Sequence, residues 1–469
     1  ATVSLLFLTA GCSVQKETVS PPVEIPDSFS DNGGIATPNE WWTEFDDPQL
    51  NAIIDSAMQG NFTILTAFER LRAAQAVTDR TAASLFPDLE ATGGGNNIVI
   101  DNLSDDVNPY QQSFELGLTS VYELDLWGRI RSSVEAEEFR TSATVADFQT
   151  AVLTLTAEIT RTWARLADAK SQVELIDQQI ETNQTVLQLL KNRLQTQQVQ
   201  GVDILRQEQL IEATREQKIT AETRVKTLEN LLAVLTGNTP QDGAGATPSA
   251  LPEPPGLPDT GVPLDLVERR PDVQSAFFQL MAADRDLASA ISSQYPRITL
   301  SLSANTQARD AGNLFEAWAL SFAGNLVAPI FYGGELRAEV DRNEAVKQQR
   351  LYEYGQSVLV AFREVEDALI RETQQEATIQ SIERQVEFAN RAYRQLRLRY
   401  LNGDANYLDV ITALDDIQQL RRDLLSARLL LVEFRIALYR ALAGSVEIDP
   451  TMLEADARTE TNGSNERQE

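Results

Sequence analysis

The sequence repeats itself: residues from about Trp41 to Gly237 and from about Leu264 to Gly444 carry the same motifs in the same order. The first half contains Ser84–Leu89 (SLFPDL), Leu126–Arg131 (LWGRIR), Arg193–Leu205 (RLQTQQVQGVDIL) and Leu231–Gly237 (LLAVLTG). The second half contains Ser293–Ile298 (SQYPRI), Tyr332–Arg337 (YGGELR), Arg399–Ile411 (RYLNGDANYLDVI) and Leu438–Gly444 (LYRALAG). Because matching landmarks stay 206 to 209 residues apart, the chain is predicted to be one fold built from two similar halves.

The composition disfavours whole classes of function. The chain has no histidine, which removes the commonest general base and the commonest neutral metal ligand, so we do not expect an enzyme. A net charge of −29 disfavours nucleic acid as a partner, because phosphates would be repelled. The excess of carboxylates suits a solvated surface or a conduit that favours cations.

The only cysteine, Cys12, follows a short apolar segment. Residues 1–11 resemble the apolar part of a secretory signal, and LTAGC resembles the cleavage site of a bacterial lipoprotein. That resemblance implies a covalent lipid on Cys12, and Ser13 after it favours the outer membrane. The alternative is an ordinary signal with a chance cysteine. No other cofactor is expected.

Long helices are predicted in both halves. Apolar residues recur at alternating intervals of three and four, which is typical of helices that supercoil side by side. Gly128 to Gly201 and Gly334 to Gly403 contain no proline and only one internal glycine, Gly355. Each segment could therefore form one helix of roughly 70 residues, or about 100 Å. A plain coiled-coil rod is the alternative interpretation.

Each half also predicts one β-hairpin. Apolar and polar residues alternate over Asp88–Ile100, Ser113–Glu123, Arg297–Asn305 and the region Trp318–Leu326. This pattern fits a transmembrane barrel and equally a soluble sheet on a core. No other segment has the ~18 uncharged apolar residues of a membrane helix, so strands would have to span any membrane. Four strands leave two open edges, so other copies would have to supply the missing partners, giving eight strands from two chains or twelve from three.

In this order, the motifs are similar to those of the TolC-like outer membrane efflux proteins, closest to the lipoprotein branch that serves resistance-nodulation-division drug exporters. The strings that carry the resemblance are Glu268–Ala276 (ERRPDVQSA), the strand entries at Pro87 and Pro296, the corners at Gly128 and Gly334, and Arg399–Val410. The resemblance implies a mainly helical homotrimer with a twelve-stranded outer-membrane β-barrel continuous with a tunnel of twelve helices. It also implies that the tunnel tips bind a periplasmic adaptor protein and an inner-membrane RND transporter.

Within the resemblance, Gly403 and Asp404 mark a helical turn at the tunnel tip and its adaptor contact. The matching turn of the first half has Gln197 where the second has Gly403, with Gly201 four residues later, so Gly201 is the candidate there.

Three further residues are implied at the periplasmic aperture: Asp203, Asp409 and Tyr400. Either aspartate could instead cap its helix, and Tyr400 also ends an apolar seam, which favours packing. The resemblance also implies a contact that closes the tips, in which a tyrosine and an arginine reach an aspartate on the neighbouring hairpin. Tyr400 and Asp203 match that pattern, but Ala405 stands at the position of the arginine.

The predicted segments are a signal remnant (1–11), a lipid-anchored extended strap (12–40), the first repeat (41–237), a proline-rich linker (238–263), the second repeat (264–444) and a disordered polar tail (445–469). The function expected from these features is a passive outer-membrane exit duct for drugs or other small molecules. A type I protein secretion channel and a lipid-anchored periplasmic scaffold remain the alternatives.

Overall fold

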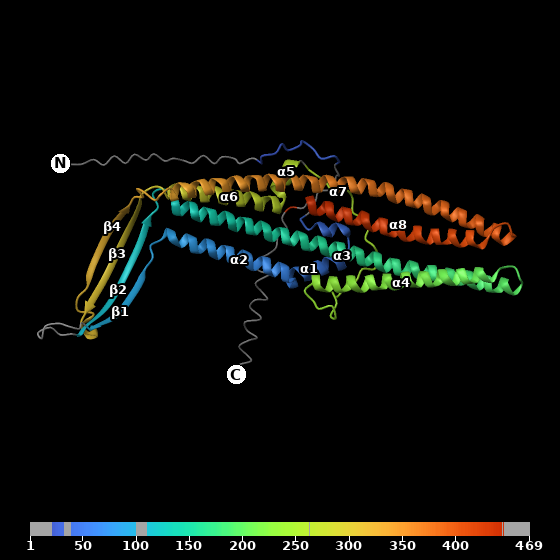
Figure 1. The fold of residues 1–469 in the computed structure, drawn as a ribbon, viewed down its shortest axis with the longest axis horizontal. Coiled ribbons are helices and arrows are strands. Elements are labelled where there is room, and N and C mark those ends of the chain that lie inside the picture. Colours follow the sequence, from blue (N-terminus) through green and yellow to red (C-terminus); the bar gives the residue numbers. More distant parts are fainter. Residues whose placement is uncertain (1–20, 32–38, 100–109, 262, 443, 445–469) are drawn as a thin grey trace.

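The computed structural model describes residues 21–31, 39–99, 110–261, 263–442 and 444. The molecule is elongated, with a small β-sheet at one end and two helical hairpins that turn at the other (Figure 1). Its principal elements are α1 (Pro48–Gly60), α2 (Phe62–Ala82), β1 (Glu90–Val99), β2 (Tyr110–Leu124), α3 (Arg129–Gln195), α4 (Gly201–Leu235), α5 (Pro263–Arg269), α6 (Pro271–Ser292), β3 (Arg297–Ala308), β4 (Ala319–Val327), α7 (Glu335–Asn402) and α8 (Tyr407–Leu442). The mainly helical fold with a small β part is therefore confirmed.

The helices α3 and α7 run almost the whole length of the helical region. They contain 67 and 68 residues, in agreement with the length expected from the missing prolines. Each begins after a glycine in the left-handed region, Gly128 at φ 78° and Gly334 at φ 92°, where a side chain would be strained. These two glycines turn the chain from a strand into a long helix. No helix in the described ranges is both long and apolar enough to cross a membrane.

The four strands form one antiparallel sheet in the order β1-β2-β3-β4. The pair β1–β2 and the pair β3–β4 have the same register when each residue of the first half is matched to its equivalent in the second half. Glu90 lies opposite Thr119, and their counterparts Thr299 and Asn325 lie opposite each other. The edge strands are open: every position of β4 is exposed, whereas most of β3 is half-buried.

The helical parts of the two halves pack in the same way. Phe68 of α2 packs on Phe148 of α3 with ring centroids 6.3 Å apart. Their counterparts in the second half, Phe277 of α6 and Tyr354 of α7, lie 5.7 Å apart. The interplanar angles are also nearly equal, at 56° and 58°. The pair α2–α3 is thus repeated as α6–α7.

A compact core holds the middle of the molecule together. Trp41 and Trp163 are fully buried there, and Trp41 stacks on Tyr439 of α8 with ring centroids 5.9 Å apart. The indole N–H of Trp163 donates to Asp47 Oδ2 at 2.8 Å, so this large ring is buried without an orphan donor. The core joins the short N-terminal helices to α3 and α8.

The segment 21–31 lies along α7. Phe29 packs edge-on against Phe362, and the backbone N–H of Ser30 donates to Glu366 at 2.9 Å. A side chain on Gly355 would meet Pro22 at 2.9 Å, so this helical glycine leaves room for the segment. The predicted linker contains no helix in residues 238–261. Cys12, the signal remnant and the polar tail lie outside the described residues.

Candidate functional site at the tip of the helical hairpins

The tip of the α7–α8 hairpin is a glycine turn. Gly403 has φ 85°, and its N–H donates to the carbonyl of Tyr400 at 3.1 Å. The N–H of Asp404 donates to the carbonyl of Arg399 at 2.8 Å. This pair of hydrogen bonds is a Schellman motif, which needs a left-handed residue at the position of Gly403.

The α3–α4 tip has the same motif with glutamine in place of glycine. Gln197 has φ 59° and donates to the carbonyl of Leu194 at 2.9 Å, while Gln198 donates to Arg193 at 3.1 Å. Gly201, expected at this turn, is instead the first residue of α4, and it is not among the glycines with positive φ. The sequence did not predict Gln197 as the left-handed residue of this turn because glutamine rarely adopts that conformation.

The two candidate aspartates occupy matching places but different environments. Asp203 and Asp409 lie in the first turns of α4 and α8. Asp203 is only 8% exposed and accepts from the backbone N–H of Gln200 at 3.3 Å, so it caps its helix. Arg206 lies 3.9 Å from its other oxygen. Asp409 is exposed, so of these two aspartates it is Asp409 whose carboxylate is directed to solvent.

Tyr400 packs at the base of the tip. Its ring lies 5.4 Å from that of Tyr407, and its hydroxyl is buried with no hydrogen-bond partner in the described structure. The hydroxyl of Tyr407 donates to Gln207. Burial raises the pKa of Tyr400, and the Asp203 carboxylate raises it further. The phenol therefore remains a protonated donor at neutral pH.

A buried polar network joins the two hairpins above the tyrosines. Asn183 of α3 and Gln418 of α8 exchange side-chain hydrogen bonds of 2.9 and 3.3 Å. Asn183 also donates to Thr214 at 3.2 Å, and Gln207 donates to the Asn183 carbonyl at 2.8 Å. Sequence reasoning missed these residues, although amides on an otherwise apolar seam are a signal. Such networks fix the register of packed helices.

The motif ERRPDV has a structural role. Arg270 is 7% exposed and binds Asp272 through hydrogen bonds of 2.9 and 2.6 Å. It also donates to Glu364 of α7 at 2.8 Å and to the Ala441 carbonyl of α8 at 3.4 Å. The motif thus fastens the start of α6 to α7 and α8.

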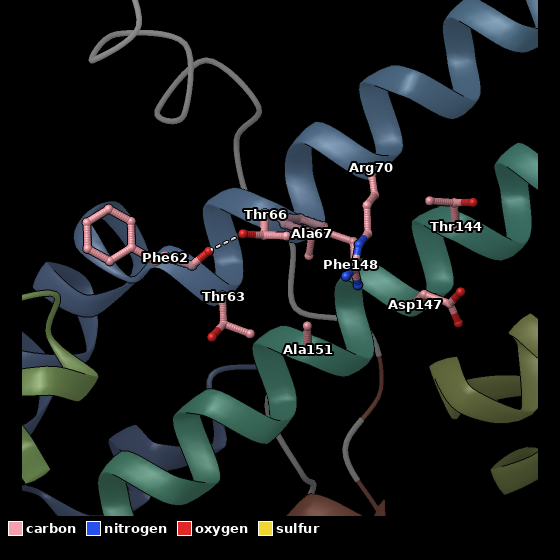
Figure 2. Close-up of a pocket in the computed structure, with 9 residues that line it drawn as sticks. All are labelled: Phe62, Thr63, Thr66, Ala67, Arg70, Thr144, Asp147, Phe148 and Ala151. Carbon is pink, nitrogen blue, oxygen red and sulfur yellow. Dashed lines mark hydrogen bonds between the residues drawn. The ribbon is translucent and has the colours of Figure 1, made fainter.

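A shallow groove lies between α2 and α3 (Figure 2). Its apolar part is formed by Ala67, Phe148 and Ala151, and its charged groups are Arg70 and Asp147. Within the described ranges, no cluster of three potential His, Cys, Asp or Glu ligands is placed to hold a metal ion.

The architecture is that of outer-membrane channel proteins. It is similar to the outer-membrane channel OprN with a TM-score of 0.82 and 26% identity, covering 91% of this chain and 99% of that one. It is similar to CusC with a TM-score of 0.85 and 25% identity, covering 92% and 100%. The chain belongs to the outer membrane efflux protein family, which it matches over residues 53–238 and 262–444.

Curated relatives agree with this assignment. The pyoverdine export outer membrane protein OpmQ of Pseudomonas aeruginosa is 28% identical, covering 87% of this chain and 88% of OpmQ. The cation efflux system protein CusC of Escherichia coli is 26% identical, covering 92% and 96%. The family predicted from the sequence is confirmed, and with it efflux as the function and the outer membrane as the location.

Proposed function

We propose that this protein is the passive exit duct of a tripartite efflux pump and acts as a homotrimer. Three copies would close their sheets into a twelve-stranded barrel, and their long helices would enclose a tunnel of twelve helices. The observation that most supports this proposal is the open four-stranded sheet from which two helices of nearly 70 residues extend in one direction.

The open sheet edges give the physical reason for assembly. In lipid, the unpaired N–H and C=O groups of β1 and β4 would each cost several kcal/mol. Closure with strands from neighbouring copies satisfies those groups. Eight strands leave an interior that side chains nearly fill, whereas a larger number leaves room for a lumen. A duct therefore favours three copies over two.

The partners of the duct would bind at the tip. An adaptor protein would contact the turns near Gly201 and at Gly403 and Asp404, and an inner-membrane RND transporter would supply the energy. Gly403 and Asp404 are exposed, and added atoms on Gly201 and Gly403 would meet open space, so both turns are accessible. The protein would catalyse no reaction and need no cofactor beyond a covalent lipid on Cys12. That lipid would hold the N-terminal segment at the outer membrane.

The periplasmic aperture would be lined by Asp409. In a trimer this exposed carboxylate occurs three times, and a ring of carboxylates favours cations over anions. Asp203 contributes less because its carboxylate already caps α4. Tyr400 would pack behind the aperture, with its free hydroxyl available to a group that moves when the tip opens.

The cargo would be drugs or other small molecules. The names of relatives assign pyoverdine, toluene and cations to those proteins, so the cargo differs between members of one fold. A wide, water-filled passage makes few specific contacts, so the transporter rather than the duct would select the cargo. Protein secretion and a non-conducting scaffold are the competing functions.

Gene deletion with complementation separates these functions. We expect the deletion strain to accumulate small toxic compounds and to become sensitive to a set of drugs, detergents and metal ions, and the wild-type gene to restore export. Loss of a secreted protein from the medium with unchanged drug sensitivity would favour protein secretion. Unchanged sensitivity and secretion, with a protein that does not oligomerise, would favour the scaffold.

A further inference from the structure

A polar groove lies between α4 and α8, with α3 beneath it. Helix α3 packs against both of these helices, whereas α4 and α8 have little contact with each other (Figure 1). The groove has a volume of about 320 Å³, near the lower end of the range of roughly 300–1,000 Å³ that is typical of small-molecule sites. All three helices belong to one chain, so the groove is complete in a single copy.

The groove combines an apolar floor with polar walls. Ala169 and Ile176 of α3 are buried, and Ala221 of α4 adds a third apolar side chain. The hydroxyl groups of Thr220 and Ser426 belong to the two opposite walls. Ligand sites typically join an apolar surface to a few polar groups that fix the orientation of the bound molecule. The composition of this groove therefore fits a small molecule with an apolar body and polar ends.

Two arginines from different helices line the groove, and neither forms an ion pair among the described residues. The guanidinium of Arg224 is exposed and makes no hydrogen bond within that part of the chain. Arg422 is half-buried and donates to the amide oxygens of Gln179 and Gln419, at 2.5 and 2.7 Å. Because amide oxygens carry no net charge, both arginines lack a carboxylate partner.

Burial makes the missing partner costly at Arg422. It lowers the pKa of this guanidinium, although Asp415 and Asp423 act in the opposite direction. A lowered pKa means that the cationic form is less stable here than in water. The more deeply buried Arg270 shows the usual solution, since it pairs with Asp272 and a second carboxylate. An anion bound in the groove would provide the same stabilisation for Arg422.

A buried acceptor in the groove also lacks a partner. Gln217 of α4 lines the groove, and its Oε1 atom is buried with no hydrogen bond in the described structure. Buried amide oxygens are normally hydrogen-bonded. A hydroxyl or N–H group on a bound molecule would satisfy this atom, so the groove suits an anion that also carries a donor.

Negative charges around the groove limit the charge of that anion. Glu216 and Asp423 also line the groove, and both are exposed. Asp168 of α3 is within electrostatic reach of Arg224 but makes no hydrogen bond with it between described residues. These carboxylates would repel a second negative charge, so a singly charged anion fits best.

We propose that this groove binds a small organic anion with one carboxylate, a short apolar or aromatic body and a hydroxyl or N–H donor. Arg422 holds the carboxylate, because a guanidinium matches its two oxygens, and Arg224 adds attraction from the opposite wall. The apolar body lies on Ile176, and the donor bonds to Gln217. The site belongs to one chain and does not depend on the proposed function.

Titration with para-hydroxybenzoate tests the site in the full-length protein. This probe has the proposed groups and is polar enough to stay out of detergent micelles. Isothermal titration calorimetry should detect binding to the wild type and at least fivefold weaker binding to Arg224→Gln and to Arg422→Gln. Arg215→Gln is the matched control, because Arg215 lies on α4 outside the groove and pairs with Glu212. It should change the affinity less than twofold.

Arg224→Gln keeps the test valid if Arg422→Gln does not fold. The guanidinium of Arg224 has no contact to lose in the described structure, so this variant should unfold at the wild-type temperature. An affinity equal to that of the wild type in Arg224→Gln, or no binding to the wild type, would overturn the proposal.

Related probes test the chemistry of recognition. Benzoate lacks the hydroxyl and should bind at least threefold more weakly than para-hydroxybenzoate. Gln217→Leu should remove that difference, because the acceptor for the hydroxyl is gone. The amine para-hydroxybenzylamine should bind at least tenfold more weakly than the acid. Equal binding of the amine and the acid would show that the arginines do not select an anion.

Conductance in a lipid bilayer separates this inference from the proposed function. A groove variant that loses binding and conducts like the wild type would support the site and leave the duct standing. A wild type that conducts but binds no para-hydroxybenzoate would overturn only the site. A wild type that binds the probe but gives no conductance would overturn only the duct.

Discussion

Gln197 and Gly403 occupy the same place in the two tip turns, and both adopt a positive φ, 59° for the glutamine and 85° for the glycine. The hydrogen bonds around them are equivalent. One turn therefore contains the residue type that this backbone favours, and the other contains a residue that is strained by it. The two tips of one duct are built with the same geometry at different energetic cost.

We predict that Gln197→Gly stabilises the α3–α4 tip. The left-handed conformation costs a residue with a side chain roughly 1–2 kcal/mol, and the gain is partly offset because glycine is more flexible when unfolded. A net gain of about 0.5–1 kcal/mol should appear as slower amide exchange in residues 193–203. Gln198→Gly is the matched control, because Gln198 has no positive φ, and it should not slow exchange.

The opposite change at the other tip should have the opposite sign. Gly403→Ala places a side chain at φ 85° and should destabilise the α7–α8 turn by roughly 1 kcal/mol, although nothing crowds the added carbon. Equal exchange rates in the wild type and this variant would contradict the account of both turns.

The two aspartates should respond differently to neutralisation. Asp409→Asn should reduce the preference for cations, measured as a smaller reversal potential across a potassium chloride gradient, and should leave stability nearly unchanged. Asp203→Asn should weaken the cap of α4, at a cost of about 0.5–1 kcal/mol, and should change selectivity less. If the two variants shift the reversal potential equally, the assignment of Asp409 to the aperture is wrong.

Asp168 makes stability depend on pH. Its side chain is 1% exposed and neither carboxylate oxygen has a hydrogen-bond partner in the described structure. Burial raises the pKa of Asp168 above its usual 3.8; Arg224 and the side chain of Gln172 oppose the shift, and Glu433 adds a smaller contribution to it. Because the pKa of Asp168 is higher in the folded than in the unfolded protein, its stabilising contribution is complete at pH values below the unfolded pKa. That contribution is lost as the pH rises through the folded pKa.

Asp168→Asn should therefore raise the unfolding temperature at neutral pH and flatten its decline between acidic and neutral conditions. The variant and the wild type would be compared by thermal unfolding at several pH values. Asp177→Asn, on the same helix but with its side chain 49% exposed and paired with Lys218, is the control that should not show this gain. A lower unfolding temperature for Asp168→Asn at pH 7 would contradict the argument.

The ion pair between Arg435 and Glu372 should be needed as a pair. Both side chains are 6% exposed, and Arg435 Nε donates to Glu372 at 3.0 Å. Glu372→Gln alone should destabilise α7–α8 packing by about 3–5 kcal/mol, because it leaves a buried guanidinium unpaired. Replacing both residues by apolar ones, as in Arg435→Met with Glu372→Leu, should recover most of that loss in thermal unfolding. A double variant as unstable as the single one would show that the pair has another role.

The repetition and the helix periodicity predicted the broad fold well, because both are local patterns. The absence of proline between Gly334 and Gly403 predicted one long helix, and in the structure this helix runs from Glu335 to Asn402. The clean alternation from Arg297 predicted β3. The sheet order followed less directly, since sequence alone does not pair strands from different halves.

The details of the tip could not be predicted because they depend on contacts between distant residues. The burial of Asp203 and the hydrogen bonds between Asn183 and Gln418 require the packing of helices that are far apart in sequence. The sequence shows Gly355 as the only internal glycine of its segment. The reason for a glycine there, which is room for Pro22 lying across the helix, appears only in the structure. The positive φ of Gln197 could not be predicted either, because glutamine rarely adopts that conformation.

The most direct test of the central claim is single-channel conductance of the purified full-length protein in a planar lipid bilayer. A passive duct made of several copies should give stable, stepwise conductance without any energy source, and Asp409→Asn should change its ion preference while Asp203→Asn changes it less. A protein that inserts as a folded oligomer and yet gives no conductance, both as the wild type and as variants at the tip, would contradict the claim that this chain encloses a passage.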